Sequence, residues 1–482
     1  MTRQKKTTVS AARVATGMAL AVGSVAGSKV MSLVAQVILG YLFSAQTYGV
    51  FAAATAALVF ATGLRNSGVS KLLIQQPEKF DELAPTYAGF AVLIGLVGTL
   101  LLVPAGFFLS LQNNMPTLGW VVMIASLSVP LSSLYSVAIA RYSVELRYEE
   151  RTANALILDA IYYAVLLIAA YIGAGEFSVA SASVLSLAFL LPPLLRRVHL
   201  KIDVVGAISK FWKIAYEVRW TILAAYLFGL SKSGDYLVLG SFLEPGQLGI
   251  YYFGYMIVGN LSVLVSLAIN QTLMPALANI RDDFLRLESA VTRSSGVVVV
   301  FSSFLSLGFI GLGGHVIHFI WNGKWDESIF VAMAIALTFP LRIMSQLGSV
   351  ILESQGRWRT NSLFLLYDAA GLMVLAALGG MFGGVDGAAI GVAIHLGLTG
   401  LVVFPASLRN AGYGYRRAIG FTIKLAMPFV VSVGVLFGIR AFSPSSGEWW
   451  VDVGSTCLAS IVLLIGSFRH VREIFRVFAR FK

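Results

Sequence analysis

Residues 224–255, AAYLFGLSKSGDYLVLGSFLEPGQLGIYYFGY, decide the fold of this chain. Two apolar runs flank a short turn that contains Glu244, Pro245 and Gly246. Each run belongs to a stretch long enough to cross a bilayer, for which about 20 apolar residues suffice. Lys232 and Asp235 lie in the middle of the first run. Because a charge inside a membrane span is costly and usually faces a cavity or a partner, both are candidate functional residues.

The turn has a counterpart 200 positions earlier in the chain. In both copies a Leu-Gly pair ends one apolar run, and a glycine followed two positions later by an aromatic residue begins the next. The matched positions are Leu39, Gly40, Leu42, Gly49 and Phe51 in the first copy and Leu239, Gly240, Phe242, Gly249 and Tyr251 in the second. One copy near the start and one near the middle indicate an internal repeat of two lobes.

The composition is that of a membrane protein. Hydrophobic residues make up 57% of the chain and charged residues 12%, with a mean hydropathy of +0.82, whereas ordinary soluble domains carry about 25% charged residues. The single cysteine, Cys457, excludes an intrachain disulfide and a cysteine-rich metal site. The first apolar stretch continues to Phe43, which is too long for the core of a signal peptide and predicts a retained span.

Apolar stretches of spanning length fill most of the chain. We count fourteen, at about residues 14–42, 48–70, 84–110, 117–140, 153–173, 177–195, 219–243, 247–275, 292–320, 327–351, 361–382, 386–408, 418–440 and 449–467. The strands of a membrane barrel need only about 9–11 alternating residues, so these lengths indicate helices. The predicted fold class is an all-α integral membrane protein with about fourteen transmembrane helices.

The repeat divides these spans into domains. Residues 1–195 and 219–410 are expected to form two pseudo-symmetric six-helix lobes. Residues 196–218 alternate basic and apolar positions, which predicts an amphipathic cytoplasmic linker at the membrane surface. Residues 411–468 would add two helices, and residues 469–482 a basic cytoplasmic tail on the anionic inner leaflet.

The distribution of charge predicts the orientation. Most of the 35 lysine and arginine residues lie in the two terminal segments and in alternate loops, while the other loops are mainly acidic. Cytoplasmic loops carry the excess of basic residues, so both termini are expected in the cytoplasm. The net charge of +12 is therefore a topology signal and does not indicate a nucleic-acid partner.

Motifs typical of enzymes are missing from the sequence. It contains no phosphate-binding GxxxxGK[ST] loop and no HExxH pair. His315 and His318 have a spacing that could bind a metal, but neighbouring Trp321 and Trp325 favour an aromatic belt at the membrane edge. We predict a transporter that is not an enzyme and has no cofactor, and that draws on a Na⁺ or H⁺ gradient.

Cationic and amide side chains inside the spans form a candidate substrate site. Cations at mid-depth from both lobes suit a phosphate or diphosphate head group, through charge-assisted hydrogen bonds. The candidates are Lys29, Gln36, Arg65, Lys232, Asn260 and Arg342. The alternative is structural: Lys232 and Asp235 would pair with each other along the helix, and Arg342 would extend to the membrane surface.

A second candidate site consists of acids in the C-terminal half. Asp235 and Asp368, with His395 in the next span, could bind Na⁺ or exchange a proton if folding brings them together. A structural role for Asp368 at the end of its helix is the alternative.

Four ordered stretches resemble one family of transporters. They are GVSKLLIQQPEKFDEL (68–83), RYSVELRYEE (141–150), GDYLVLGSFLEPGQLGIYYFGYMI (234–257) and LMPALANIRDDFLRLESAVTR (273–293). The chain resembles the polysaccharide-transporter (Wzx-type oligosaccharide flippase) branch of the MOP superfamily, over spans 1 to about 10. Within that branch it is most similar to the exporters of colanic acid and other exopolysaccharides.

The resemblance implies a fold and a function. Two six-helix lobes would form a V and move an undecaprenyl-diphosphate-linked oligosaccharide to the outer leaflet by alternating access. Asp235 and Asp368 match the spans that hold a Na⁺ site in lipid II flippases. Typical members use arginines in the central cavity, where this chain has Lys29 and Lys232. The implied partners are the lipid bilayer, the lipid-linked substrate, a polysaccharide polymerase and its co-polymerase.

Two other functions compete with this prediction. A multidrug or cation antiporter of the same superfamily would have an apolar or acidic pocket, which a set of lysines and arginines argues against. The other is a membrane-embedded scaffold or polymerase subunit. A polymerase would need a large outer catalytic loop, whereas the outer loops predicted here are short.

Overall fold

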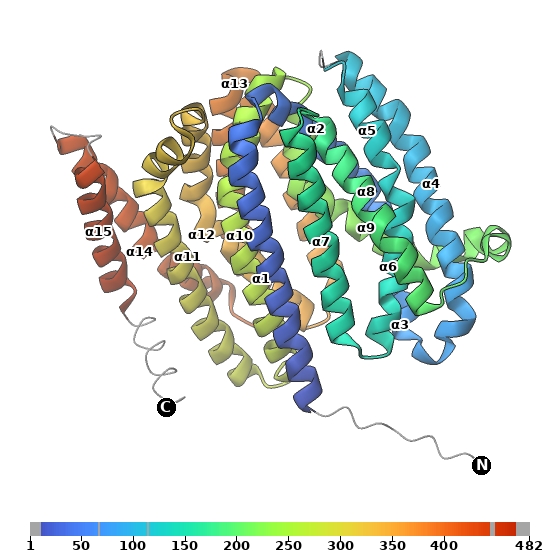
Figure 1. Cartoon of the computed structure of the whole chain (residues 1–482). Coiled ribbons are helices and arrows are strands. Elements are labelled where there is room, and N and C mark those ends of the chain that lie inside the picture. Colours follow the sequence, from blue (N-terminus) through green and yellow to red (C-terminus); the bar gives the residue numbers. More distant parts are fainter. Residues whose placement is uncertain (1–10, 66–67, 113–114, 444–448, 469–482) are drawn as a thin grey trace. The chain divides into compact units, whose positions relative to one another are not determined.

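The computed structural model describes residues 11–65, 68–112, 115–443 and 449–468 (Figure 1). These residues form α-helices, two short 3-10 helices and connecting turns, and none of them is in a strand. The predicted all-α fold is confirmed. The basic tail predicted at residues 469–482 lies outside the described residues.

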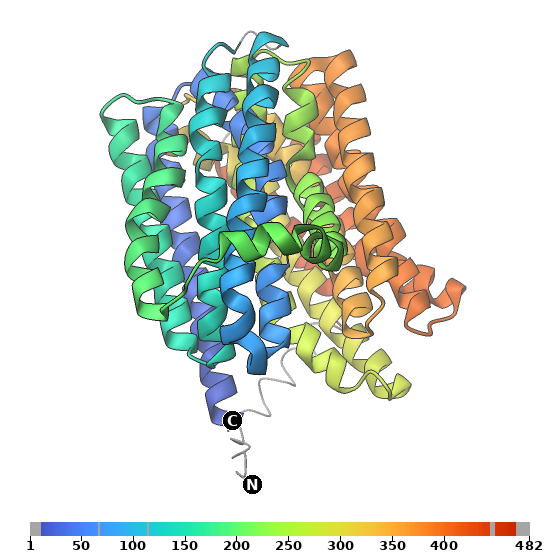
Figure 2. The same cartoon turned by 90° about the vertical axis from the view of Figure 1, so that its right-hand side faces the viewer.

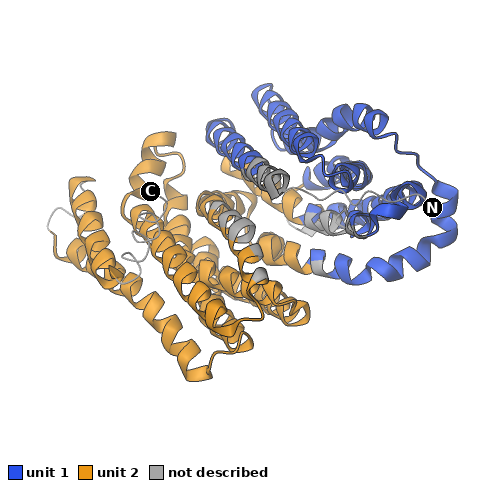
Figure 3. Cartoon of the chain, turned by 90° about the horizontal axis from the view of Figure 1, so that it is seen from below, with its two compact units in different colours: residues 1–42, 57–108, 117–226 blue, residues 43–56, 109–116, 227–482 orange. Residues whose placement is uncertain are grey.

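The chain divides into two compact units (Figure 3). Unit 1 comprises residues 1–42, 57–108 and 117–226, and unit 2 comprises residues 43–56, 109–116 and 227–482. Three helices pass from one unit to the other: α2 (Ala45–Arg65), α4 (Phe80–Gln112) and α9 (Val204–Leu239). Unit 2 thus includes a segment from the N-terminal half of the chain, and the lobe boundaries predicted from the sequence stay a prediction.

Unit 1 is built mainly from long helices. Besides its parts of α2, α4 and α9, it contains α1 (Ala11–Leu42), α3 (Val69–Gln75), η1 (Pro77–Lys79), α5 (Leu118–Ser126), α6 (Ser128–Val144), α7 (Tyr148–Tyr171) and α8 (Phe177–Val198). Phe90 of α4, Val137 of α6 and Leu191 of α8 belong to one buried apolar cluster. Packing of these side chains positions α6 and α8 beside the cavity described below.

The first part of α9 lies crosswise over α4 (Figure 2). The rings of Phe211 and Phe90 are 5.2 Å apart, and Ala207 is fully buried in the cluster that α4 helps to form. The opposite side exposes large apolar residues, including Trp212 at 82%. An exposed tryptophan beside lysines such as Lys210 is what a helix at a membrane surface requires.

Unit 2 contains the remaining helices. They are α10 (Pro245–Asn279), α11 (Phe284–Trp321), η2 (Asp326–Ser328), α12 (Ile329–Ser354), α13 (Trp358–Asn410), α14 (Tyr415–Phe442) and α15 (Trp449–Gly466). The inner side of α12 is buried against α10, α11 and α13, with Ile343, Leu347 and Phe404 in a shared apolar cluster. This packing places the polar side chains of α9, α12 and α13 inside the unit.

Helix α13 is two helices joined at Gly383 and Gly384. Gly384 has φ 57° and ψ −138°, a conformation open to glycine because a side chain would clash with the backbone. A Cβ added to Gly379 would overlap the carbonyl oxygen of Gly387, so the two halves are in close contact. Its 53 residues would extend about 80 Å as one helix, against about 30 Å for a bilayer core. The sequence predicted this break between the spans 361–382 and 386–408.

Among the described residues, ten helices are long and apolar enough to span a membrane, or eleven if the bent α9 is included. In this number α13 is counted as one helix. The many apolar helices make the chain a multi-pass membrane protein. The number of helices that meet the criteria is lower than the fourteen spans expected from the sequence.

The helix starts that follow the two matched turns lie together in unit 2. Tyr48, at the start of α2, has its ring 5.5 Å from that of Phe253 and 5.1 Å from that of Trp325. The start of α2 is also in backbone contact with the start of α10, through Gly49 and Gly249. The repeat predicts such proximity, since equivalent turns should lie at the same end of the molecule.

Candidate functional site

Buried polar side chains form a network inside unit 2. Arg342 of α12 donates from Nη1 to both carboxylate oxygens of Asp368 of α13, at 2.7 and 2.8 Å. Ser231 of α9 donates to the same carboxylate. Nε2 of His395 lies 3.1 Å from Asp368 Oδ1, and Thr399 Oγ1 lies 3.1 Å from that nitrogen. Three helices therefore converge on one carboxylate.

Asp235 is one helical turn after Ser231 and is completely buried. The hydroxyl of Tyr251 donates to Asp235 Oδ2 at 2.8 Å. Its Oδ1 has no hydrogen-bond partner of normal geometry in the described part of the chain. Arg342 also interacts electrostatically with Asp235, which links this carboxylate to Asp368. We call Asp235, Arg342, Asp368 and His395 the buried charge network.

The buried charge network is costly to assemble. Desolvating an ion costs several kcal/mol, and a partner repays this only when the geometry is good. The network contains one guanidinium and two carboxylates, so with all three groups ionised and His395 neutral it carries one net negative charge. A proton or a monovalent cation would balance it. The arrangement is thus chemically suited to bind and release one positive charge.

The structure regroups the residues predicted for the two sites. The sequence predicts Arg342 among the ligands of a diphosphate, with Asp235 and Asp368 as a separate pair. In the structure Arg342 forms an ion pair with Asp368 and interacts electrostatically with Asp235. A contact of Arg342 with a diphosphate stays a prediction. His395 was also expected among the acids, while Ser231 and Tyr251 were missed, because one serine or tyrosine in a span carries no distinctive signal.

The remaining predicted residues are spread over both units. Lys232 is half-buried, with its ammonium nitrogen 5.6 Å from the centre of the Phe228 ring. Lys29 is half-buried in α1 of unit 1, and Asp159 of α7 is its acidic neighbour. That Lys29 and Lys232 share one cavity stays a prediction.

Three further candidates have local contacts or lie outside the description. Gln36 Nε2 donates to Ser32 Oγ at 3.3 Å. Asn260 Nδ2 donates to the carbonyl oxygen of Met256 at 2.9 Å. Arg65 is the last residue of α2, and its side chain is not among those described.

The two histidines considered for metal binding have acidic partners instead. His315 Nε2 lies 2.6 Å from Asp452 Oδ2, and Arg440 Nη2 lies 2.6 Å from Asp452 Oδ1. His318 Nδ1 lies 2.8 Å from Asp326 Oδ2. In the residues that the structure describes, no group of three or more His, Cys, Asp or Glu side chains could hold a metal ion. We interpret the contacts of Asp452 as joining α11, α14 and α15.

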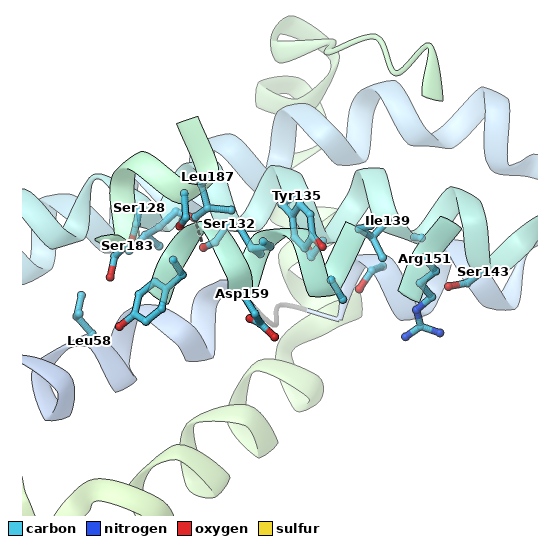
Figure 4. Close-up of a pocket in the computed structure, with 18 of the residues that line it drawn as sticks. Leu58, Ser128, Ser132, Tyr135, Ile139, Ser143, Arg151, Asp159, Ser183 and Leu187 are labelled. Carbon is cyan, nitrogen blue, oxygen red and sulfur yellow. Dashed lines mark hydrogen bonds between the residues drawn. The ribbon is translucent and has the colours of Figure 1, made fainter. Parts of the chain in front are cut away.

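Unit 1 contains a cavity of about 600 Å³, within the usual size of ligand pockets. Half of its lining residues carry a hydroxyl group: Ser70, Ser128, Ser132, Ser136, Ser143, Ser183, Ser186, Tyr135, Tyr162 and Tyr163. The charged lining residues are Arg151 and Asp159, both on α7. In Figure 4, Arg151 lies towards the end of the cavity where Ser143 is, and Asp159 lies nearer its middle. We call this space the hydroxyl cavity.

Three serines of the hydroxyl cavity already use their proton within their own helix. Ser132, Ser136 and Ser183 each donate their proton to a carbonyl oxygen of their own helix, at 2.9, 2.8 and 2.7 Å. A hydroxyl oxygen that has donated its proton still has lone pairs that accept hydrogen bonds. Ser143 Oγ is buried without a hydrogen-bond partner among the described residues. The cavity therefore suits a ligand that brings many hydroxyl donors.

The sequence-based candidates for a substrate site include none of the residues that line the hydroxyl cavity. Ser128, Ser132 and Ser136 recur every fourth residue, a spacing that places them on one face of α6. This periodicity was a usable signal. It was hidden because serine is also common where membrane helices pack closely.

Comparisons with known proteins agree on one family and one fold. Residues 38–330 match the family model described as "Polysaccharide biosynthesis protein". The amylovoran biosynthesis protein AmsL of Erwinia amylovora is 23% identical over 304 residues, which are 60% of this chain and 74% of the relative.

Two solved structures show the fold. The lipid II flippase MurJ in an inward closed conformation superposes with a TM-score of 0.73 at 15% identity, over 94% of this chain and 98% of the other. An inward-facing multidrug resistance MATE transporter of the MOP superfamily superposes with a TM-score of 0.63 at 14% identity, over 80% and 94%. The fold is that of MOP superfamily transporters, as the sequence analysis predicted.

Proposed function

Because the chain belongs to the polysaccharide biosynthesis protein family, we propose that it flips a lipid-linked oligosaccharide across the cytoplasmic membrane by alternating access. The lipid would be undecaprenyl diphosphate, and the product would supply a surface polysaccharide or exopolysaccharide. A fold shared with a protein named a lipid II flippase supports this proposal. So does a relative named for the biosynthesis of amylovoran.

The hydroxyl cavity is the observation that carries the proposal. Sugars offer many hydroxyl donors, and the cavity offers serine oxygens such as Ser132 and Ser136 that accept hydrogen bonds. Tyr135 and Tyr162 supply rings against which the apolar face of a sugar can stack. A purely apolar drug would leave these polar groups without partners, at a cost in free energy.

The diphosphate would bind to cations outside this cavity. We assign Lys29, Arg65 and Lys232 to this role, with Gln36 and Asn260 as hydrogen-bonding neighbours. Arg342 is committed to Asp368, so we assign it to coupling instead. Affinity for the diphosphate should be modest, because the substrate must leave on the far side.

The buried charge network would couple transport to an ion gradient. Its net negative charge changes when Asp235 takes up H⁺ or when Na⁺ binds beside it. Binding of H⁺ or Na⁺ would alter the strength of the ion pair between Arg342 and Asp368. Because this pair joins α12 and α13, the contact between the two helices would change. A conformational change driven by a bound ion requires such a difference between two states.

The sidedness of the protein follows the charge of its loops. We place both termini in the cytoplasm and the protein in the inner membrane. A polysaccharide polymerase and its co-polymerase are proposed partners on the far side, since a flipped repeat unit must be polymerised there.

Measuring lipid intermediates tests the proposal. A host strain lacking this protein should accumulate polyprenyl-diphosphate oligosaccharide and lose surface polysaccharide, and the wild-type gene should reverse both. A multidrug antiporter is the second candidate, because Asp159 and the tyrosines of the cavity could also hold an organic cation. Unchanged lipid intermediates together with hypersensitivity to organic cations would favour that candidate.

A further inference from the structure

A pocket rimmed by arginines lies where α13 ends and α14 begins. It has a volume of about 640 Å³, and its charged lining residues are Arg357 and Arg409. Asn410 and Tyr415 line it too, and none of the lining residues is acidic. A neighbouring pocket shares Arg409 and Tyr415. We call this space the arginine pocket.

The two arginines are accessible and only partly engaged. Arg357 Nη1 donates to Asn410 Oδ1 at 3.0 Å, which leaves the other N–H groups of the guanidinium for a ligand. Arg409 lies with its guanidinium carbon 5.9 Å from the centre of the Tyr415 ring. Arg417, on the next turn, is instead paired with Glu288. The positive charge at the pocket is therefore not cancelled by the acid nearby.

The other wall of the arginine pocket is apolar. Leu401 and Val402 of α13 are 43% and 46% exposed, and Pro405 and Ile419 complete the wall. This wall lies on spanning segments one to two turns from Arg409, so it runs from the arginines into the depth of the membrane. A ligand with a phosphate at one end and a hydrocarbon chain at the other fits both features.

We propose that the arginine pocket binds an anionic phospholipid of the surrounding bilayer, with its phosphate between Arg357 and Arg409 and an acyl chain along Leu401 and Ile419. Charge complementarity selects the anionic head group, since two cations and no carboxylate face it. The hydroxyl cavity lies on other helices. The lining of the arginine pocket includes no residue of the buried charge network. Bound lipid would join the end of α13 to the start of α14.

Native mass spectrometry of the full chain tests this proposal. Protein in neutral detergent is titrated with phosphatidylglycerol or with phosphatidylcholine of the same chain length. For the variant R357Q/R409Q we expect about tenfold weaker binding of the first phosphatidylglycerol, from the loss of two charges at the phosphate. The matched control R281Q/R286Q removes two exposed arginines that are already paired with Asp282 and Asp283, and it should bind like the wild type. Equal binding by R357Q/R409Q and the control would overturn the proposal.

Competition on the wild-type protein provides a test that needs no variant. Phosphatidylcholine and millimolar inorganic phosphate should fail to displace the bound phosphatidylglycerol. Displacement by phosphatidylcholine would show that the head group is not selected. Displacement by phosphate alone would make this a phosphate-ion site, and preference for a polyprenyl phosphate would assign the pocket to the carrier lipid. Each of these results would reject the proposal.

Discussion

Gly49 packs against the backbone of Pro245 so closely that a Cβ on Gly49 would overlap the Pro245 carbonyl oxygen. The reciprocal contact joins Gly249 to the carbonyl oxygen of Ala45. A shift of 200 positions exchanges one contact for the other. Each turn therefore contacts the other in the same way, as at an interface with two-fold symmetry.

This contact predicts that neither glycine tolerates a side chain. The G49A and G249A variants should each unfold at lower temperature, because overpacking against a backbone atom costs about 1–3 kcal/mol or more. Thermal unfolding in detergent measures the effect. The control is G420A, in the interior of α14, where an added Cβ meets no atom within 4 Å. A melting temperature for G49A equal to that of G420A would contradict the close contact.

The ion pair between Arg342 and Asp368 predicts that stability can be restored without restoring transport. R342L leaves Asp368 buried without its charge partner and should cost about 3–5 kcal/mol of stability. The double variant R342L/D368L removes both charges and should recover most of that loss. Neither variant should export polysaccharide, because the coupling charge is gone. Export by the double variant would show that the pair is only structural.

Lys232 predicts a direct effect on the substrate. K232A should abolish polysaccharide export while the protein still inserts into the membrane, and K232R should retain part of it. A lysine inside a membrane span costs about 2.5–3.5 kcal/mol on insertion, and a bound diphosphate would offset part of this cost. If Lys232 only neutralises Asp235, the double variant K232A/D235A should export normally. Asp235 accepts its described hydrogen bond from Tyr251, so we expect no such recovery.

The hydroxyl cavity predicts graded losses from single serines. S136V and S183V replace an acceptor with a methyl group and should each reduce the export rate about two- to tenfold, the worth of one hydrogen bond. Protein amount and melting temperature should change little. The control is S362V, since Ser362 makes the same bond to its own helix on an exposed face of α13. Equal export by S136V and S362V would remove the cavity from the substrate path.

The predicted sidedness can be tested with introduced cysteines. Cys457 is the only cysteine, so C457S provides a background free of thiols. In intact spheroplasts an impermeant maleimide should label F442C, which is on the predicted outer side and 91% exposed. It should label K201C only after the membrane is opened. The reverse pattern would invert every assignment of sidedness.

The amino-acid sequence by itself determined that this is a helical membrane protein of the polysaccharide biosynthesis family. Long apolar stretches leave the helix as the way to satisfy backbone hydrogen bonds in lipid, and Gly383 and Gly384 lie between the spans expected at 361–382 and 386–408. The sequence also contains the matched glycines Gly49 and Gly249, which contact each other's helix start.

Tertiary structure decided which polar residues act together. Arg342 and Asp368 are 26 positions apart, and neither residue's own helix indicates that they face each other. The hydroxyl cavity likewise depends on how α6, α7 and α8 rotate about their axes when they pack. A span's length and hydrophobicity are local properties of the chain, whereas the direction in which a side chain points is set by the neighbours that bury it.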